Sequence, residues 1–417
     1  MRLWIDKEAA HAPNPTTGNR EASMTDIAVL PIKADPLTRA RALGPALQAA
    51  ADEIERSQEI PEPLLGQLHE ARLFRMLLPR SVGGDQVEPW VYMRVVEEIA
   101  SHDGSVGWNT FVANSSALIV PFIPIEAART IYGDPRSVIS WGPPNQHRCI
   151  AVPGGYRVTG EWHFSSGRRQ ANWIGAHCQV VETDGSLRLN RFGRPTIRTL
   201  LMPKADTTPI HDWNTIGMRG TASEGYSVRD VFVPELFSGT REDPSLRRDK
   251  GPLYAFTTQN LYAVGVAGVA LGIARAMLEA FMALAAEKAP RNLGRLADNP
   301  MVQSDVAQLE ASLGSARAYL VDMMKEAWAI ADDVEPLPPH HRARVRLASS
   351  HAIKCSLDVA DRVYKAAGTS AIFPGTPFER RFRDIHTLSQ QIQSRENHFE
   401  IVGRVMLNGD PENTFLG

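Results

Sequence analysis

Residues 155–167 read GYRVTGEWHFSSG, and the rest of the chain is best understood outward from this stretch. Apolar and polar side chains alternate with the period of a β-strand on both sides of a Thr159-Gly160 turn or bulge. The alternation stops at the Phe164-Ser165-Ser166-Gly167 end. Such an end exposes backbone N–H groups and short hydroxyls beside aromatic surface, as a flat polar ring such as a flavin requires. The alternative is a core hairpin that happens to have a polar end.

The composition is that of a soluble globular protein. The 417 residues allow two or three domains, and hydrophobic and charged contents of 43% and 22% are ordinary. A net charge of -2 gives no reason to expect a nucleic acid or a membrane surface as a partner. Three cysteines without CxxC spacing argue against a structural metal site or a disulfide framework, and they fit a reducing, cytoplasmic location. No apolar run of about 18 residues predicts a membrane-spanning helix.

The hydrophobic period divides the chain into four predicted parts. Residues 1–35 are polar and aperiodic, which predicts a disordered N-terminal extension, with Met24 as an alternative start. Residues 36–136 follow a helical period and predict an N-terminal α-helical domain. Residues 137–243 alternate with a period of two between regular glycines and prolines, which predicts a β domain built as a small antiparallel sandwich or barrel. Residues 244–417 return to the helical period and predict a C-terminal helical bundle.

Individual elements are predicted from the same periods. The helices expected are Leu37–Ser57, Pro63–Ala71, Glu88–Ser101, one starting at Val106, Tyr254–Ala286, Gln303–Ile330, Pro338–Gly368 and Asp384–Leu407. The strands expected are Val138–Trp141, Tyr156–Phe164, Trp173–Val181, Thr196–Pro203 and Ser227–Val233. Gly265, Gly268 and Gly272 are spaced for close helix packing. The long helices have broad apolar faces, so we also expect self-association.

Several tryptophans stand beside small polar residues. Trp108 and Asn114 share the helix that starts at Val106, and Ser140-Trp141 closes a strand in a proline-rich turn. Trp213 begins a long loop punctuated by glycines. Tryptophan faces stack well on a flat guest such as a phenol or an indole. Each tryptophan could equally be a core residue, and Asn114 could equally satisfy a neighbouring backbone group.

Three motifs make the chain resemble the acyl-CoA dehydrogenase superfamily from about Leu37 to the end. Residues 97–107 (EEIASHDGSVG) are similar to its "EELARxDxSxG" segment, and residues 217–234 (GMRGTASEGYSVRDVFVP) are similar to its "GxRGSxTxxVxFxxVxVP" segment. Arg291 opens an RNLG run where the family has an "RxxFG"-like turn that reaches a flavin phosphate. The resemblance implies an α+β fold with an N-terminal helical domain, a middle β-sandwich or barrel and a C-terminal four-helix bundle.

Within that superfamily the chain looks closer to the flavin-dependent monooxygenases than to the dehydrogenases. Many dehydrogenases carry their base, a glutamate, in an "IYEGTSQIQ" segment, but residues 385–393 read IHTLSQQIQ and place Thr387 there. A neutral hydroxyl cannot abstract the proton next to a thioester carbonyl. Residues 154–167 fit the "GGYRVSGxWxFxSG" segment of the 4-hydroxyphenylacetate, secosteroid phenol, dibenzothiophene and indole or indole-3-acetate monooxygenases.

That resemblance implies a two-component oxygenase. A separate flavin reductase would supply reduced flavin, FMN or FAD. Oxygen would then react through a C4a-(hydro)peroxyflavin and oxygenate a small aromatic substrate. The matching cofactor residues are Trp162, Phe164, Ser165, Ser166 (beside flavin N5), Gly167, Arg291 (at the phosphate) and, across a subunit interface, Gly368, Thr369 and Ser370. The residues implied to face the substrate are Trp108, Asn114, Ser140, Trp141 and Trp213. A homodimer or homotetramer is expected.

One departure concerns the proton carrier. Many of these oxygenases have a histidine in the final helix, and the matching position here is Gln391, which can donate a hydrogen bond but cannot shuttle a proton near neutral pH. His386 lies five residues earlier and would point away on a regular helix, so it could substitute only if the helix started after it. His386 could instead be a packing histidine. An acyl-CoA dehydrogenase with FAD and a non-catalytic flavin-binding homologue are the alternatives.

Overall fold

Helices precede the sheet in the computed structural model, which describes residues 34–144, 146–291, 294–333 and 335–409. They are α1 (Pro36–Ala42), α2 (Gly44–Ser57), α3 (Glu62–Glu70), α4 (Pro89–His102), α5 (Gly104–Ser116) and α6 (Ile125–Tyr132). The single helix expected over Leu37–Ser57 is two helices, because a proline is tolerated in the first turn of a helix and not inside it, and Pro45 therefore opens α2. The expected disorder of residues 1–35 concerns mainly residues 1–33, which lie outside the described residues.

The middle of the chain forms one mixed sheet. Its strands are β1 (Ile139–Trp141), β2 (Arg148–Val152), β3 (Gly155–Trp162), β4 (Trp173–Val181), β5 (Ile197–Pro203), β6 (Thr208–Ile210), β7 (Gly225–Pro234) and β8 (Ser238–Gly239). The strand order is β6-β7-β3-β2-β4-β5-β8, and β1 pairs with β4. β1 and β2 pair with β4 in parallel, and the other pairs are antiparallel. The sheet is therefore mixed, whereas the sequence predicted an antiparallel one. The expected bulge in β3 is present, since the register with β7 shifts between Val158 and Gly160.

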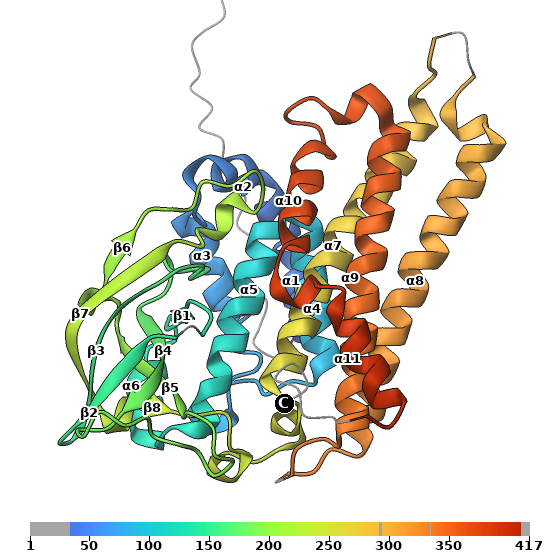
Figure 1. Ribbon diagram of the computed structural model, residues 1–417. Coiled ribbons are helices and arrows are strands. Elements are labelled where there is room, and N and C mark those ends of the chain that lie inside the picture. The colour runs from blue at the N-terminus through green and yellow to red at the C-terminus, as the bar shows by residue number, and fades with distance from the viewer. Residues whose placement is uncertain (1–33, 145, 292–293, 334, 410–417) are drawn as a thin grey trace, which may run out of the picture.

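The C-terminal part is a helical bundle. It contains α7 (Thr258–Glu287), α8 (Pro300–Ala329), α9 (Pro339–Ala367), α10 (Glu379–Ser389) and α11 (Asn397–Met406). In Figure 1 the sheet lies on one side of α5, and α7, α9 and α8 follow on the other side. α7 is long and apolar enough to cross a membrane, but 83% of its most apolar window is buried, as in the core helix of a soluble protein.

The glycines of α7 allow the close packing that their spacing predicted. α7 packs against both α4 and α9. A Cβ atom at Gly272 would lie 2.3 Å from the carbonyl oxygen of Glu97 in α4, and one at Gly265 would lie 2.6 Å from the ring of Phe111 in α5. Only glycine fits at these positions: the backbones of α7 and α4 meet at Gly272, and the Phe111 ring packs against the α7 backbone at Gly265.

The final helix expected over Asp384–Leu407 is broken in two. α10 ends at Ser389, and the chain passes through a short 3₁₀ turn before α11 begins at Asn397. Gln391 stands at this break with an extended backbone (φ -71°, ψ 148°), and its side chain caps the turn by accepting from the backbone N–H of Gln393. The sequence between Ser389 and Asn397 has no proline or glycine to announce the break, which explains why the period alone missed it.

Candidate functional site

The turn that follows β3 presents a bare aromatic face next to two serines. Phe164 has a left-handed backbone (φ 59°) and is 63% exposed, although it is a large apolar residue. The turn is tied to the loop that leads into β7, because Ser165 N donates to Glu224 O and Gly167 N donates to Thr221 O. Trp213 meets the Phe164 ring edge to face at 6.2 Å between centroids. The two rings form one apolar edge beside Ser166.

A chain of hydroxyl groups starts at Ser166, and we call Ser166, Ser223 and Thr221 the hydroxyl chain. Ser166 Oγ lies 2.6 Å from Ser223 Oγ, and Ser223 Oγ lies 2.7 Å from Thr221 Oγ1. Thr221 Oγ1 lies 2.7 Å from the carbonyl oxygen of Met218. From the other side, Trp108 Nε1 donates to Ser166 Oγ over 3.0 Å. Ser166, Ser223 and Thr221 are all buried.

The hydroxyl chain has one direction. A carbonyl oxygen only accepts, so Thr221 donates its hydrogen to Met218. Ser223 must then donate to Thr221, and Ser166 must donate to Ser223. One lone pair of Ser166 Oγ is taken by the Trp108 N–H. Ser166 therefore has no hydrogen left to give and one lone pair with which to accept.

The neighbouring serines hold this arrangement in place. Ser140 Oγ donates to the carbonyl oxygen of Ser166 over 2.8 Å and lies 2.8 Å from Ser165 Oγ. Because the hydrogen of Ser140 is committed to that carbonyl, Ser165 donates to Ser140. Ser140 belongs to β1, so the turn after β3 is also fixed to that strand. The structure thus brings together Ser140, Ser165, Ser166 and Trp108, all proposed from the sequence as substrate-facing or cofactor residues.

Aromatic side chains continue from Trp108 between the sheet and the helices, and we call Trp108, Phe111, Tyr262 and Trp141 the aromatic row. The Trp108 and Phe111 rings meet at 4.7 Å, and the Phe111 and Tyr262 rings at 5.5 Å. Trp141 Nε1 donates to the Tyr262 hydroxyl over 2.9 Å. Burial raises the pKa of Tyr262, which keeps this hydroxyl protonated. His177 of β4 meets the far edge of Trp141 at 5.0 Å.

Two polar groups beside Trp141 lack partners. The guanidinium carbon of Arg241 lies 4.9 Å from the centre of the Trp141 ring, and Arg241 Nη1 is buried without a hydrogen bond among the described residues. His177 is 1% exposed; its Nδ1 lies 2.9 Å from Thr199 Oγ1, while its Nε2 is unpartnered there. Burial, and then the Arg241 charge, lower the pKa of His177 well below its ordinary value, so the ring is neutral.

Two of the predicted site residues serve the core. Trp162 is fully buried, stacks on Tyr226 at 5.4 Å and donates to the carbonyl oxygen of His177. Asn114 is also fully buried and uses its side chain on the backbone: it accepts from Met76 N and Leu77 N and donates to two carbonyl oxygens. Neither side chain has a free polar atom for a ligand. For Asn114 this is the alternative that the sequence left open.

The C-terminal candidates have partners of their own. His386 lies inside α10, and its Nε2 is 2.9 Å from Asp361 Oδ1 in α9, so its partner lies on the bundle and not in the hydroxyl chain. Thr387 Oγ1 donates to the Arg383 carbonyl oxygen one turn back. No carboxylate therefore stands at the position where many dehydrogenases carry their base.

Arg291, Gly368, Thr369 and Ser370 gather at the end of α7 and α9. Lys288 Nζ donates to the carbonyl oxygen of Ala367 over 2.8 Å and to Ser370 Oγ over 2.9 Å, which joins the two helix ends. Arg291 follows as an exposed residue. Phe111 meets Gly265 near the start of α7, whereas α7 ends 22 residues later at Glu287, a rise of roughly 33 Å. This cluster is therefore remote from the Ser166 of its own chain.

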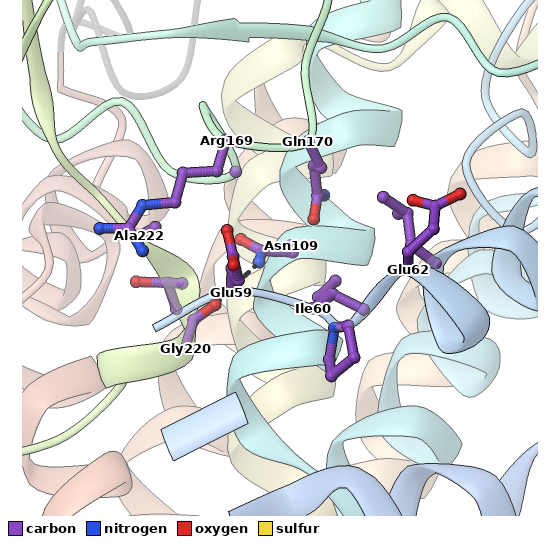
Figure 2. Close-up of a pocket in the computed structure, with 12 residues that line it drawn as sticks. Glu59, Ile60, Glu62, Asn109, Arg169, Gln170, Gly220 and Ala222 are labelled. Carbon is purple, nitrogen blue, oxygen red and sulfur yellow. Dashed lines mark hydrogen bonds between the residues drawn. The ribbon is translucent and has the colours of Figure 1, made fainter. Parts of the chain in front are cut away.

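A cavity of about 220 Å³ lies behind the hydroxyl chain, where the turn after α2 meets α5 (Figure 2). Gly167 and Thr221 form one wall, and Asn109 contributes a buried amide whose Oδ1 has no partner among the described residues. The volume is below the roughly 300–1,000 Å³ of ordinary ligand pockets, so this cavity does not hold a flavin. Within the described part of the chain, no group of three or more His, Cys, Asp or Glu side chains could hold a metal ion.

The sequence missed four residues that complete the site: Thr221, Ser223, Arg241 and Tyr262. Thr221 and Ser223 could have been proposed from the sequence, because these two hydroxyl residues stand in a loop already identified as a family motif. Arg241 and Tyr262 left no local signal, because each meets Trp141 from more than 95 positions away. Contacts between residues so far apart in the chain can be identified only once the fold is known.

Two family models match the chain. "Acyl-CoA dehydrogenase, N-terminal domain" covers residues 41–125, and "Acyl-CoA dehydrogenase, C-terminal domain" covers residues 264–395. Among solved structures, XiaF from Streptomyces sp. in complex with FADH2 and glycerol superposes with a TM-score of 0.83 at 23% identity, over 91% of this chain and 96% of that one. The predicted acyl-CoA dehydrogenase-like fold is confirmed.

Curated relatives extend over nearly the whole chain. An indole-3-acetate monooxygenase of Pseudomonas putida is 28% identical over 389 residues, which are 89% of this chain and 96% of the relative. The oxygenase subunit HsaA of a flavin-dependent monooxygenase of Rhodococcus jostii is 27% identical over 399 residues, which are 91% and 96% of the two chains. The predicted resemblance to flavin-dependent oxygenase components is confirmed.

Proposed function

We propose that this chain, which belongs to the acyl-CoA dehydrogenase superfamily, is the oxygenase component of a two-component flavin-dependent monooxygenase. It would take reduced flavin, FMN or FAD, from a separate reductase and use O2 to oxygenate a small aromatic substrate. We further propose that it works in the cytoplasm as a homodimer or homotetramer. The relatives that cover nearly all of its length are named as monooxygenases, which supports the reaction class.

The observation that carries the proposal is the polarity of Ser166. Its Oγ can accept one more hydrogen bond and has no hydrogen to donate, because the hydroxyl chain fixes its proton. N5 of a reduced flavin bears a hydrogen, whereas N5 of an oxidised flavin has only a lone pair. Ser166 therefore fits the reduced ring and opposes the oxidised one. The exposed face of Phe164, next to Ser166, offers the flavin ring an apolar surface to pack against.

When bound, the reduced flavin supplies the electrons that activate O2. The chain's own residues hold the ring and keep the reaction dry. Ser166 would accept from the N5 hydrogen, and Trp108 and Ser223 fix the Ser166 hydroxyl from opposite sides. The aromatic row forms an apolar wall from Trp108 to Trp141, where a flat substrate would pack and water would be excluded.

Oxygen uptake tests this function. The full chain is mixed with chemically reduced FMN or FAD in the presence and absence of indole, and O2 consumption and oxygenated product are measured. The proposal expects indole-dependent product formed in proportion to O2 consumed. An acyl-CoA dehydrogenase would instead pass electrons from an acyl-CoA to an artificial acceptor without O2, and a non-catalytic homologue would bind flavin and form no product; either result refutes the proposal.

A further inference from the structure

The guanidinium of Arg241 is a positive charge without a counter-charge. It follows β8 and lies over Trp141 at 4.9 Å, on the inner side of the sheet near the tyrosine of the aromatic row. The structure gives it no hydrogen bond and no ion pair with any described residue. The nearest acid, Glu242, is committed elsewhere: its Oε2 accepts from Asn190 Nδ2 and from Ile197 N.

An unpaired guanidinium in this position is destabilising unless an anion or a hydrogen-bond acceptor pairs with it. Arg241 is half-buried, and its Nη1 is fully buried without a hydrogen bond among the described residues, so this end of the guanidinium loses hydration that nothing in the described chain replaces. Burial lowers the pKa of Arg241, which records that cost, but a guanidinium still stays protonated. Arg198 of β5, by contrast, donates to Ser238 and pairs with Glu235 at 2.9 Å. Arg241 is thus built for a partner that the chain itself does not supply.

We infer that Arg241 binds an oxyanion of the ligand, a carboxylate or a phosphate, beside the face of Trp141. The planar guanidinium can accept such a group in a two-pronged hydrogen bond. His177 Nε2, also unpartnered at this edge, can donate to the same oxyanion in the tautomer that protonates Nε2, with Nδ1 then accepting from Thr199.

Two ligands of the proposed function carry such a group, and the inference rests on that function for their identity. An aromatic acid would place its ring along the aromatic row and its carboxylate at Arg241. FMN or FAD would place its phosphate there. The aromatic acid is favoured for two reasons. Arg241 stacks on Trp141, which ends the aromatic row. Trp141 also directly follows Ser140, whose hydroxyl donates to the Ser166 carbonyl oxygen, so the anion site lies one residue from the contact with Ser166.

The test compares ligands that differ only in the anion. Dissociation constants are measured for the full chain with indole-3-acetate against 3-methylindole, and with FMN against riboflavin, for the wild type and for Arg241→Met and Arg241→Lys. Arg198→Met is the matched control, since it removes a paired arginine from the same sheet. Melting temperatures of all variants are recorded without ligand.

The wild type should bind indole-3-acetate at least about tenfold tighter than 3-methylindole. Arg241→Met should remove that advantage and melt no lower than the wild type, Arg241→Lys should keep part of it, and Arg198→Met should keep it while melting lower. Loss of the FMN advantage over riboflavin instead would support the same site with phosphate as its anion. Equal affinities for both pairs in the wild type, unchanged ratios in Arg241→Met, or an Arg241→Met protein that melts as low as Arg198→Met would overturn the inference. None of these results depends on O2 uptake, which tests the proposed function separately.

Discussion

At the residue scale, we expect the direction of the hydroxyl chain to set which redox form of flavin the proposed site binds. Ser223→Ala removes the acceptor that holds the Ser166 hydrogen, so Ser166 could then donate to the N5 lone pair of an oxidised ring. We expect the preference for reduced over oxidised flavin to fall by about five- to tenfold, the value of one ordinary hydrogen bond. Anaerobic titrations with both forms measure it.

A substitution at the other partner of Ser166 tests whether the donor direction, and not merely the loss of a hydrogen bond, sets the preference for reduced flavin. Trp108→Phe also removes a hydrogen bond to Ser166, but it leaves the Ser166 hydrogen committed to Ser223. We expect both flavin forms to bind less tightly to that variant, with a ratio of affinities near that of the wild type. If Trp108→Phe and Ser223→Ala changed the ratio equally, the direction assigned to the chain would be wrong.

Asp384 gives the protein a pH-dependent stability. This carboxyl of α10 is 3% exposed and accepts from Met218 N; burial raises its pKa to about 7. In the unfolded chain it ionises near pH 4, so between about pH 4 and 7 the folded state keeps a proton that the unfolded state releases. The free energy of unfolding contributed by this group is therefore full below pH 4 and falls as the pH rises to 7.

Asp384→Asn should remove that loss, because the amide still accepts from Met218 and carries no charge. At pH 8 we expect the variant to unfold with about 1–3 kcal/mol more free energy than the wild type, and the gain should vanish towards pH 4. Asp305→Asn on the surface of α8, where the carboxylate pairs with Arg362, is the control and should show no such gain. Denaturant melts across the pH range would contradict the account if both variants behaved alike.

At the element scale, close packing of α7 depends on its glycines. Gly272→Ala would put a Cβ 2.3 Å from a carbonyl oxygen of α4, and the backbone there cannot give way locally. We expect a loss of about 1–3 kcal/mol in unfolding free energy. Gly314→Ala in α8, where a Cβ would meet nothing within 4 Å, should instead stabilise by about 0.5–1 kcal/mol. Equal effects of the two substitutions in urea melts would mean that glycine packing does not matter here.

The elements were predictable where one period ran long enough. β4 has the predicted bounds, and β3, β5, α4, α8 and α9 lie within a few residues of theirs. The strands that escaped prediction, β2, β6 and β8, have two to five residues, too few to establish an alternation. The parallel pairing of β1 and β2 with β4 depends on how distant segments return to the sheet, which local periodicity does not contain.

The site followed the same rule. Phe164, Ser165 and Ser166 could be proposed from the sequence, because they lie in one continuous motif. Arg241 was not found, because only the fold carries it to Trp141. The position of Gln391 outside the helix could not be foreseen either, since the break after α10 has no turn residue to mark it.

At the scale of the whole molecule, two groups of predicted cofactor residues lie too far apart for one flavin in one chain. We expect Arg291 to serve the flavin of a neighbouring subunit, and Ile372 and Phe373, 54% and 60% exposed beside Ser370, to be covered by that neighbour. Native mass measurement should therefore show at least a dimer. Arg291→Ala should weaken flavin binding about tenfold or more with an unchanged melting temperature.

Mixed assemblies test the exchange of residues between subunits. Ser166→Ala and Arg291→Ala chains are each expected to bind flavin weakly alone. Co-expressed in one assembly they should regain some tight sites, because one neighbour pair then combines an intact Ser166 with an intact Arg291. Arg295→Ala, which breaks only a surface pair with Asp298, is the control for the local substitution. Arg291 would belong to no neighbouring site if mixing restored nothing.

The most direct test of the central claim is an anaerobic titration of the full wild-type chain with reduced and with oxidised FMN. Because Ser166 can accept from the N5 hydrogen but has none to give, reduced FMN should bind about tenfold or more tightly than oxidised FMN. Equal binding of the two forms, tighter binding of the oxidised form, or binding of neither would contradict the account.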